Sequence, residues 1–214
     1  MKQYDLYIFD FDMTLFDSFA GVRKAYCKAF DAVGIPLDES MCVQYVKESI
    51  DQTFARFSNS PCKFREFVSA FIKESQISMA SNTTIFSESG EVIKTLFRKE
   101  KHLCIASCKM EERIIAILEK HQLSRYFEYI IGYEHTLFPK PSPYCLEWCI
   151  SHYDIPLERI CYVGDGVKDM IAAKAAGIDG IHICRDGIED GSCTVSIRDL
   201  GELLQCYKRE DWSN

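Results

Sequence analysis

The sequence lacks any long hydrophobic run and any excess of positive charge. No apolar stretch approaches the ~18 residues that a membrane-spanning helix needs, and the opening residues, from Met1 to Asp5, do not resemble a signal peptide. The 25 Lys+Arg and 32 Asp+Glu residues give a formal net charge of −7. This balance argues against binding to a nucleic-acid backbone or to an anionic membrane surface. We therefore expect a cytoplasmic protein with neither kind of partner.

The sequence also lacks the paired Cys-x-x-Cys spacing of a structural zinc site, although it contains 11 cysteines. Cys104 and Cys108 are four residues apart, and so are Cys145 and Cys149. Inside a cell such thiols are expected to be free and mostly buried. The five histidines form no metal-ligand pattern. The sequence therefore does not predict a metal held by sulfur or imidazole.

The overall composition is that of an ordinary globular protein. Hydrophobic residues make up 47% of the sequence and charged residues 27%, which excludes a disordered chain, collagen and a long coiled coil. The 214 residues suit one domain, or one domain that carries an insertion.

Five short, nearly continuous apolar runs predict parallel strands that are buried on both faces. They are Tyr4–Phe9, Leu103–Ala106, Tyr129–Ile131, Ile160–Val163 and Ile181–Ile183. Helical patterns lie between them: Glu111–His121, a helix opened by Ser142 and Pro143, and the Ala-rich Asp169–Ala176, which closes at Gly177. This alternation predicts an α/β fold with a doubly wound, Rossmann-like parallel sheet.

One long segment interrupts the alternation between the first two predicted strands. Two stripes of apolar residues recur there at helical spacing. The first is Phe19, Val22, Tyr26, Phe30 and Val33, and the second is Phe64, Phe67, Val68, Phe71 and Ile72. We therefore predict an α-helical domain over residues 18–82, inserted into an α/β core made of residues 1–17 and 83–214.

Polar side chains follow the predicted strands at their carboxyl ends, where open α/β sheets bind ligands. The segments are Asp10 to Thr14, Ser107 to Lys109, Lys140 with its flanking prolines, and Gly164 to Asp169. Four carboxylates, those of Asp10, Asp12, Asp165 and Asp169, are expected to converge, and they repel one another unless a cation neutralises them. Oxygen ligands without clustered His or Cys favour Mg²⁺. For Lys109 and Lys168, a place at the edge of this site and a solvated position are both open.

This order of motifs resembles the haloacid dehalogenase superfamily, specifically its phosphatase-type members with a helical cap between the first two motifs. The resemblance is carried by Asp10-Phe11-Asp12-Met13-Thr14, by Ser107 at a strand end, by Lys140-Pro141-Ser142-Pro143, and by Gly164-Asp165-x-x-x-Asp169 before an Ala-rich helix. The sequence departs from the family pattern at Cys108, where Asn or another small polar residue is usual, and at Gly166, where Ser or Thr is usual.

The resemblance implies a Mg²⁺-dependent phosphatase that acts on a small phosphorylated metabolite. It implies Asp10 as the nucleophile that forms an aspartyl-phosphate, and Asp12 as the general acid and base. The Mg²⁺ ligands are implied to be Asp10, the backbone carbonyl of Asp12, and Asp165, with Asp169 completing the acidic cluster. Ser107 and Lys140 are implied to hold the phosphoryl group.

Further substrate contacts are implied around this centre. Thr14 and Cys108 are candidates at the phosphate pocket, and Lys47 and Ser49 are candidates in the cap. Phosphoglycolate is one option for the substrate, and both a monomer and a homodimer are open. Oxidation of Cys108 is a hypothesis for loss of activity.

Two alternative functions remain. A sugar-phosphate mutase like β-phosphoglucomutase uses the same motifs but transfers the phosphoryl group to a sugar, and the difference depends on how well a closed cap excludes water. A non-catalytic protein that binds a phosphorylated ligand would keep the same fold. Dehalogenase and phosphonatase relatives are disfavoured because they lack a carboxylate at the position of Asp12.

Overall fold

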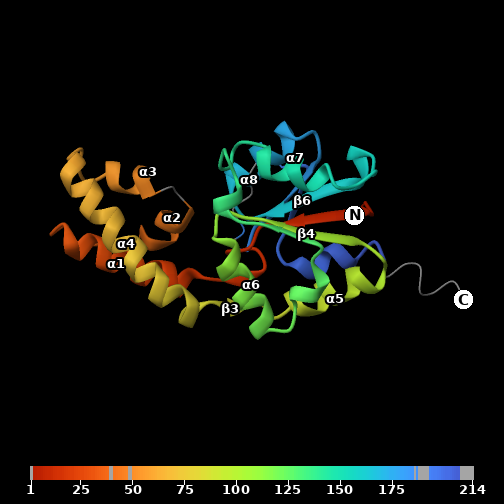
Figure 1. The fold of residues 1–214 in the computed structure, drawn as a ribbon, viewed down its shortest axis with the longest axis horizontal. Helices are drawn as coiled ribbons and strands as arrows, with labels where there is room; N and C mark the ends of the chain where they lie inside the picture. Colours follow the sequence, from red (N-terminus) through yellow and green to blue (C-terminus); the bar gives the residue numbers. More distant parts are fainter. Residues whose placement is uncertain (1, 39–40, 48–49, 186, 188–192, 208–214) are drawn as a thin grey trace, which may run out of the picture. The chain divides into compact units, whose positions relative to one another are not determined.

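The computed structural model describes residues 2–38, 41–47, 50–185, 187 and 193–207. The chain forms two compact units, one of Met1–Phe16 and Ile85–Asn214, and the other of Asp17–Thr84 (Figure 1). The chain passes from one unit to the other at β2 (Phe16–Asp17) and returns at β3 (Thr84–Ile85). These two short strands pair with each other.

The first unit is built on a six-stranded sheet in the order β5-β4-β1-β6-β7-β8. The strands are β1 (Leu6–Phe9), β4 (His102–Ala106), β5 (Tyr129–Ile131), β6 (Ile160–Gly164), β7 (Asp179–Ile183) and β8 (Val195–Ile197). All neighbouring strands run parallel. After β1 the chain adds strands on one side of it and then on the other, so the order reverses at β1. The carboxyl end of β1 is therefore a topological switch point, where α/β sheets bind ligands.

Successive residues of the strands face two separate apolar clusters, and for this reason the runs are apolar throughout. Phe9, Ile105 and Val163 belong to the cluster with α5 (Ser89–Arg98), α6 (Glu111–Lys120) and the 3₁₀ helix η5 (Leu200–Leu204). Ile8, Cys104 and Tyr162 belong to the cluster with α7 (Tyr144–Ile150) and α8 (Val167–Ala175). Figure 1 shows these helices on opposite faces of the sheet. The predicted α/β fold with a Rossmann-like parallel sheet is confirmed.

The second unit is helical and has its own apolar core. Its helices are α1 (Phe19–Ala32), α2 (Cys42–Lys47), α3 (Ile50–Ala55) and α4 (Pro61–Asn82). Aromatic rings join α1 to α4: the ring centroids of Tyr26 and Phe71 lie 4.8 Å apart, and those of Phe30 and Phe67 lie 5.0 Å apart. Gly21 permits a close approach of the two helices, because a Cβ there would lie 2.8 Å from the backbone of Met79.

Some elements differ from the predictions. The helix expected to open at Ser142 begins at Tyr144, with Pro143 at the N-cap. The strand β8 was not predicted, because polar residues flank its three residues and no long apolar run marks it. Among the described residues, no helix is both long enough and apolar enough to span a membrane.

Candidate active site

The strand register brings the candidate residues to one edge of the sheet. Phe9 lies opposite both Ile105 and Val163, so β1, β4 and β6 end at nearly the same level. The backbone N–H of Asp10 extends the ladder by donating to the carbonyl of Val163 at 2.8 Å. Ser107 does the same with the carbonyl of Ile131 at 3.0 Å. Asp10 and Ser107 therefore lie on backbone that the sheet holds in place.

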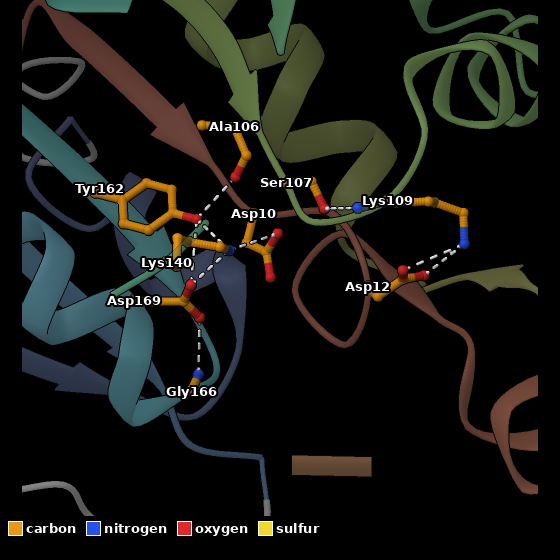
Figure 2. Close-up of polar contacts among 9 residues, drawn as sticks. All are labelled: Asp10, Asp12, Ala106, Ser107, Lys109, Lys140, Tyr162, Gly166 and Asp169. Atoms are coloured by element: carbon orange, nitrogen blue, oxygen red, sulfur yellow. Dashed lines mark hydrogen bonds and ion pairs between the residues drawn. The ribbon is translucent and has the colours of Figure 1, made fainter. Parts of the chain in front are cut away.

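Lys140 lies at the centre of the buried polar groups at this edge (Figure 2). Its Nζ is 2.6 Å from Oδ1 of Asp169 and 3.1 Å from Oδ1 of Asp10, and it donates a hydrogen bond of 2.8 Å to the hydroxyl of Tyr162. Burial alone would lower the pKa of Lys140, but the carboxylates of Asp10 and Asp169 outweigh burial and raise that pKa well above its usual value. The Lys140 ammonium is therefore positively charged throughout the physiological pH range.

Asp169 connects this lysine to the start of α8. Its Oδ2 accepts a hydrogen bond from the backbone N–H of Gly166 at 2.9 Å, in the first turn of the helix. A carboxylate is favourable there because of the partial positive charge at a helix N-terminus. The Asp169 side chain also explains why residue 164 is a glycine, because a Cβ at that position would lie 2.5 Å from Oδ2 of Asp169.

Asp10, Asp165 and Asp169 form an acidic cluster in which one oxygen of each residue lies within 4.8 Å of the others. Burial raises the pKa of Asp10 to about 6, although the charge of Lys140 acts in the opposite direction. Burial, with the nearby carboxylates of Asp169 and Asp10, raises the pKa of Asp165 well above its usual value. Burial is the largest cause of both shifts, because it removes the solvation of the charged carboxylates.

The acidic cluster fits a divalent cation. Its donors are all carboxylate oxygens, which hard cations such as Mg²⁺ prefer. Oδ1 of Asp10 is buried and makes no hydrogen bond within the part of the chain that the structure describes. The three carboxylates and the Lys140 ammonium together carry a charge of −3 + 1 = −2. One divalent cation would balance this charge.

Of the four carboxylates that were expected to converge, that of Asp12 is not part of the acidic cluster. Lys109, which is only 7% exposed, donates from Nζ to both carboxylate oxygens of Asp12, at 3.0 and 3.2 Å. Figure 2 shows the Asp12 side chain directed toward Lys109 rather than toward Asp10. Of the two positions that the sequence left open for Lys109, the structure therefore favours a place at the site.

The remaining sequence candidates have different surroundings. Thr14 is fully buried, and its Oγ1 has no hydrogen-bond partner among the described residues. Cys108 is exposed. Lys47 ends α2, but its side chain and all of Ser49 lie outside the described residues. Contacts of these four residues with a substrate stay predictions.

The structure adds two polar residues that the sequence did not indicate. The hydroxyl of Tyr162 donates to the backbone carbonyl of Ala106, immediately before Ser107, at 2.8 Å. His182, on β7, has its Nε2 at 3.0 Å from the backbone carbonyl of Asp165. Both belong to apolar strand runs, so a sequence pattern gives no signal for the polar partner that each one meets.

The carboxylates and the buried lysine lie at the switch point of a parallel α/β sheet, which is where proteins of this architecture bind their ligands. The chain belongs to the haloacid dehalogenase-like hydrolase family, whose model matches residues 7–183.

Individual proteins agree with this assignment. The phosphoglycolate phosphatase of Vibrio cholerae is 26% identical over 189 residues, which cover 83% of each chain. A structure described as a haloacid dehalogenase-like hydrolase from Bacteroides fragilis matches with a TM-score of 0.84 and 25% identity, covering 94% of this chain and all of that one. A haloacid dehalogenase-like family hydrolase from Streptococcus pneumoniae shares the fold, with a TM-score of 0.82 and 19% identity over 95% of this chain and 98% of that chain. The predicted membership among phosphatase-type hydrolases of the superfamily is confirmed.

Proposed function

We propose that this protein is a Mg²⁺-dependent phosphatase that hydrolyses the phosphate monoester of a small metabolite through an aspartyl-phosphate on Asp10. The observation that carries this proposal is the position of Asp10. Its carboxylate projects from the end of the central strand, 3.1 Å from the Lys140 ammonium and within the acidic cluster. A carboxylate held beside fixed positive charge is suited to attack phosphorus.

In the first chemical step, an oxygen of Asp10 forms a bond to phosphorus as the bond from phosphorus to the leaving oxygen breaks. The leaving alkoxide takes a proton from Asp12 as general acid. In the second step Asp12 accepts a proton from water, and the water oxygen forms a bond to phosphorus as the bond from phosphorus to the Asp10 oxygen breaks. Inorganic phosphate leaves, the Asp10 carboxylate is restored, and Asp12 again holds the proton that it gave in the first step. To perform both transfers, the Asp12 carboxylate must exchange its contact with Lys109 for one with the leaving group.

Ser107 and Lys140 would hold the phosphoryl oxygens during both steps, Ser107 by a hydrogen bond and Lys140 by its charge. Asp165, Asp169, Asp10 and the backbone carbonyl of Asp12 would hold Mg²⁺. When bound, Mg²⁺ supplies positive charge between the carboxylate nucleophile and the anionic phosphate. Asp169 would in addition keep Lys140 in place through its contact of 2.6 Å.

We propose that the helical unit, Asp17–Thr84, acts as the cap that selects the substrate. The polar edge of the sheet offers groups for a phosphate, but few that would distinguish one alcohol portion from another. Lys47 and Ser49 remain candidates for contacts with that portion. Phosphoglycolate belongs in the first substrate panel, because the Vibrio cholerae relative is named for its hydrolysis.

The test is phosphate release from phosphoglycolate, sugar phosphates, nucleotides and p-nitrophenyl phosphate, with Mg²⁺ and with EDTA. We expect release with Mg²⁺ from the wild-type protein and none from Asp10→Asn. Asp154→Asn makes the same chemical change at an exposed position and should keep full activity. No release from any compound by folded protein would overturn the proposal. Conversion of a hexose 1-phosphate without phosphate release would indicate the mutase instead.

A further inference from the structure

Tyr162 places a polar group in the apolar layer beneath the candidate active site. It is the third residue of β6 and is fully buried, with its ring in the cluster between the sheet and the helices α7 and α8. A buried phenol hydroxyl normally has hydrogen-bond partners. Here the partners are Ala106, Lys140 and Asp169, which come from three other parts of the chain (Figure 2).

The distances indicate which partner accepts the proton of the Tyr162 hydroxyl and which partner donates to its oxygen. A phenol has one proton to donate, and its oxygen can also accept. The Ala106 carbonyl is the nearer acceptor at 2.8 Å, whereas Oδ1 of Asp169 lies at 3.3 Å. The Lys140 ammonium donates to the phenol oxygen at 2.8 Å. The hydroxyl therefore joins Lys140 to the strand end that immediately precedes Ser107.

The hydrogen bond to Tyr162 fixes the direction of the Lys140 ammonium, which the carboxylates alone do not. A lysine ammonium is a compact charge on a flexible stem, so attraction to Asp10 and Asp169 sets its distance from them but only weakly its direction. The phenol oxygen is a third, neutral partner, and it is carried by a rigid strand. The hydrogen bonds to Asp169 and Tyr162, together with the ion pair to Asp10, therefore define the position of Nζ.

We propose that Tyr162 is a positioning residue that sets the place of Lys140 relative to Ser107. These are the two side chains that would hold the phosphoryl oxygens, so this inference rests on the proposed function. The buried hydroxyl acts through its contacts with Lys140, Asp169 and the Ala106 carbonyl rather than through a contact with substrate. Its contribution is the alignment of two phosphate-binding groups that come from different elements.

The first test is Tyr162→Phe, which keeps the ring and removes the hydroxyl. We expect kcat/KM to fall about tenfold or more, mainly in kcat, because the misplaced ammonium no longer matches the transition state. The affinity for inorganic phosphate in Mg²⁺, measured by calorimetry, should fall in parallel. Tyr162→Met offers the same comparison if the Phe variant does not fold.

Tyr7→Phe is the matched control. The Tyr7 hydroxyl is also buried, on β1 of the same sheet, and lies 2.9 Å from that of Tyr207. Its removal should lower stability but leave kcat and phosphate affinity unchanged. If Tyr162→Phe behaves like Tyr7→Phe, the hydroxyl serves stability alone and the inference is wrong.

A double-mutant cycle with Lys140→Met separates positioning from general weakening. If Tyr162 acts through Lys140, adding Tyr162→Phe to Lys140→Met should change phosphate affinity by less than about twofold, because the group being positioned is already gone. Independent effects that simply multiply would contradict the inference. Wild-type protein without turnover would refute the proposed function, whereas equal phosphate affinity of wild type and Tyr162→Phe would refute the role of Tyr162.

Discussion

At the scale of single residues, the main feature of the candidate site is a buried positive charge that lies among buried carboxylates. Lys140 is almost completely buried and touches the carboxylates of Asp10 and Asp169. Burying a charge is unfavourable unless an opposite charge accompanies it. In the proposed mechanism Lys140 would therefore have two functions: it neutralises part of the acidic cluster before a substrate arrives, and it would then be available to a phosphoryl group.

Removal of this charge by Lys140→Met should lower kcat by about 10²–10³-fold, the usual effect of losing one group that stabilises transition-state charge. Steady-state kinetics at saturating Mg²⁺ measures the change. Lys174→Met alters an exposed lysine of α8 and should have no effect. Activity of Lys140→Met within a few-fold of wild type would contradict the assigned role.

Some of these residues could be predicted from the sequence and others could not. Asp10, Ser107, Asp165 and Asp169 each follow or flank a recognisable strand, so their arrival at one edge follows from the parallel order. The contacts of Tyr162 and His182 depend on which strands become neighbours, which local patterns do not report. For Lys109, charge and spacing alone did not distinguish a solvated side chain from one at the edge of the site.

At the scale of elements, a close helix–helix contact in the helical unit and a group of ion pairs beside the sheet hold neighbouring elements together. In the helical unit, α1 and α4 approach so closely that residue 21 has no room for a side chain. At the amino edge of the sheet, Asp5 lies just before β1 and pairs with both Arg159 and Lys101. This arrangement connects β1 to the segments that lead into β4 and β6.

The close approach of α1 and α4 predicts that a Gly→Ala change at residue 21 has the opposite effect to one at a helical position with free space. Gly21→Ala should destabilise the protein by about 1–3 kcal/mol, because its Cβ would meet the backbone of Met79 at 2.8 Å. Gly90→Ala, in α5, has a nearest neighbour at 3.8 Å and should gain up to about 1 kcal/mol from helix propensity. Urea denaturation measures both free energies of unfolding. Equal effects at the two positions would contradict the close approach of α1 and α4.

The ion pairs of Asp5 at the amino edge of the sheet predict that the stability of the protein depends on pH. Hydrogen bonds and charge from Arg159, with those of Lys101, lower the pKa of Asp5 to about 2. Because the folded pKa lies below the unfolded value of about 3.9, the stabilisation is complete above that value and is lost as the pH falls toward 2. Asp5→Asn should therefore lower stability by about 1 kcal/mol at pH 7, after allowance for solvent screening.

Thermal unfolding of Asp5→Asn and wild type between pH 2 and pH 7 measures this difference. It should shrink below pH 4 and be small at pH 2. Asp154→Asn should show no such trend. A difference between Asp5→Asn and wild type that stays constant across the range would contradict the linkage.

The elements themselves were predictable to different degrees. The strands buried on both faces were predicted because a short, uninterrupted apolar run between helical patterns is typical of a strand that helices cover on both sides. The strand β8 escaped prediction because its pairing with β7, rather than its sequence, makes it a strand. Helix α7 begins one residue later than predicted, because Pro143 rather than Ser142 is its N-cap.

At the scale of the whole molecule, the chain combines two units with separate apolar cores. The α/β unit contains the acidic cluster and Lys140, and the helical unit is the part that we propose to select the substrate. Because a divalent cation would balance the negative charge of the acidic cluster, we expect cation binding and folding of the α/β unit to be linked.

This linkage predicts that Mg²⁺ raises the melting temperature of the protein. At 100 times the dissociation constant, the gain in unfolding free energy is about 2.7 kcal/mol. Asp165→Asn removes one donor of the cluster and should abolish most of the shift. Asp12→Asn should keep it, because the Asp12 carboxylate contacts Lys109 and lies outside the cluster. A full shift in Asp165→Asn would contradict the assigned cation site.

The proposed mechanism requires that Asp10 becomes covalently phosphorylated. Acid quenching during turnover of a substrate labelled in its phosphoryl group, followed by peptide mapping, detects this intermediate. We predict a label on Asp10 that hydroxylamine removes and that is absent from Asp10→Asn. Turnover by the wild-type protein without any label on Asp10, or with a stable label on another residue, would contradict the claim.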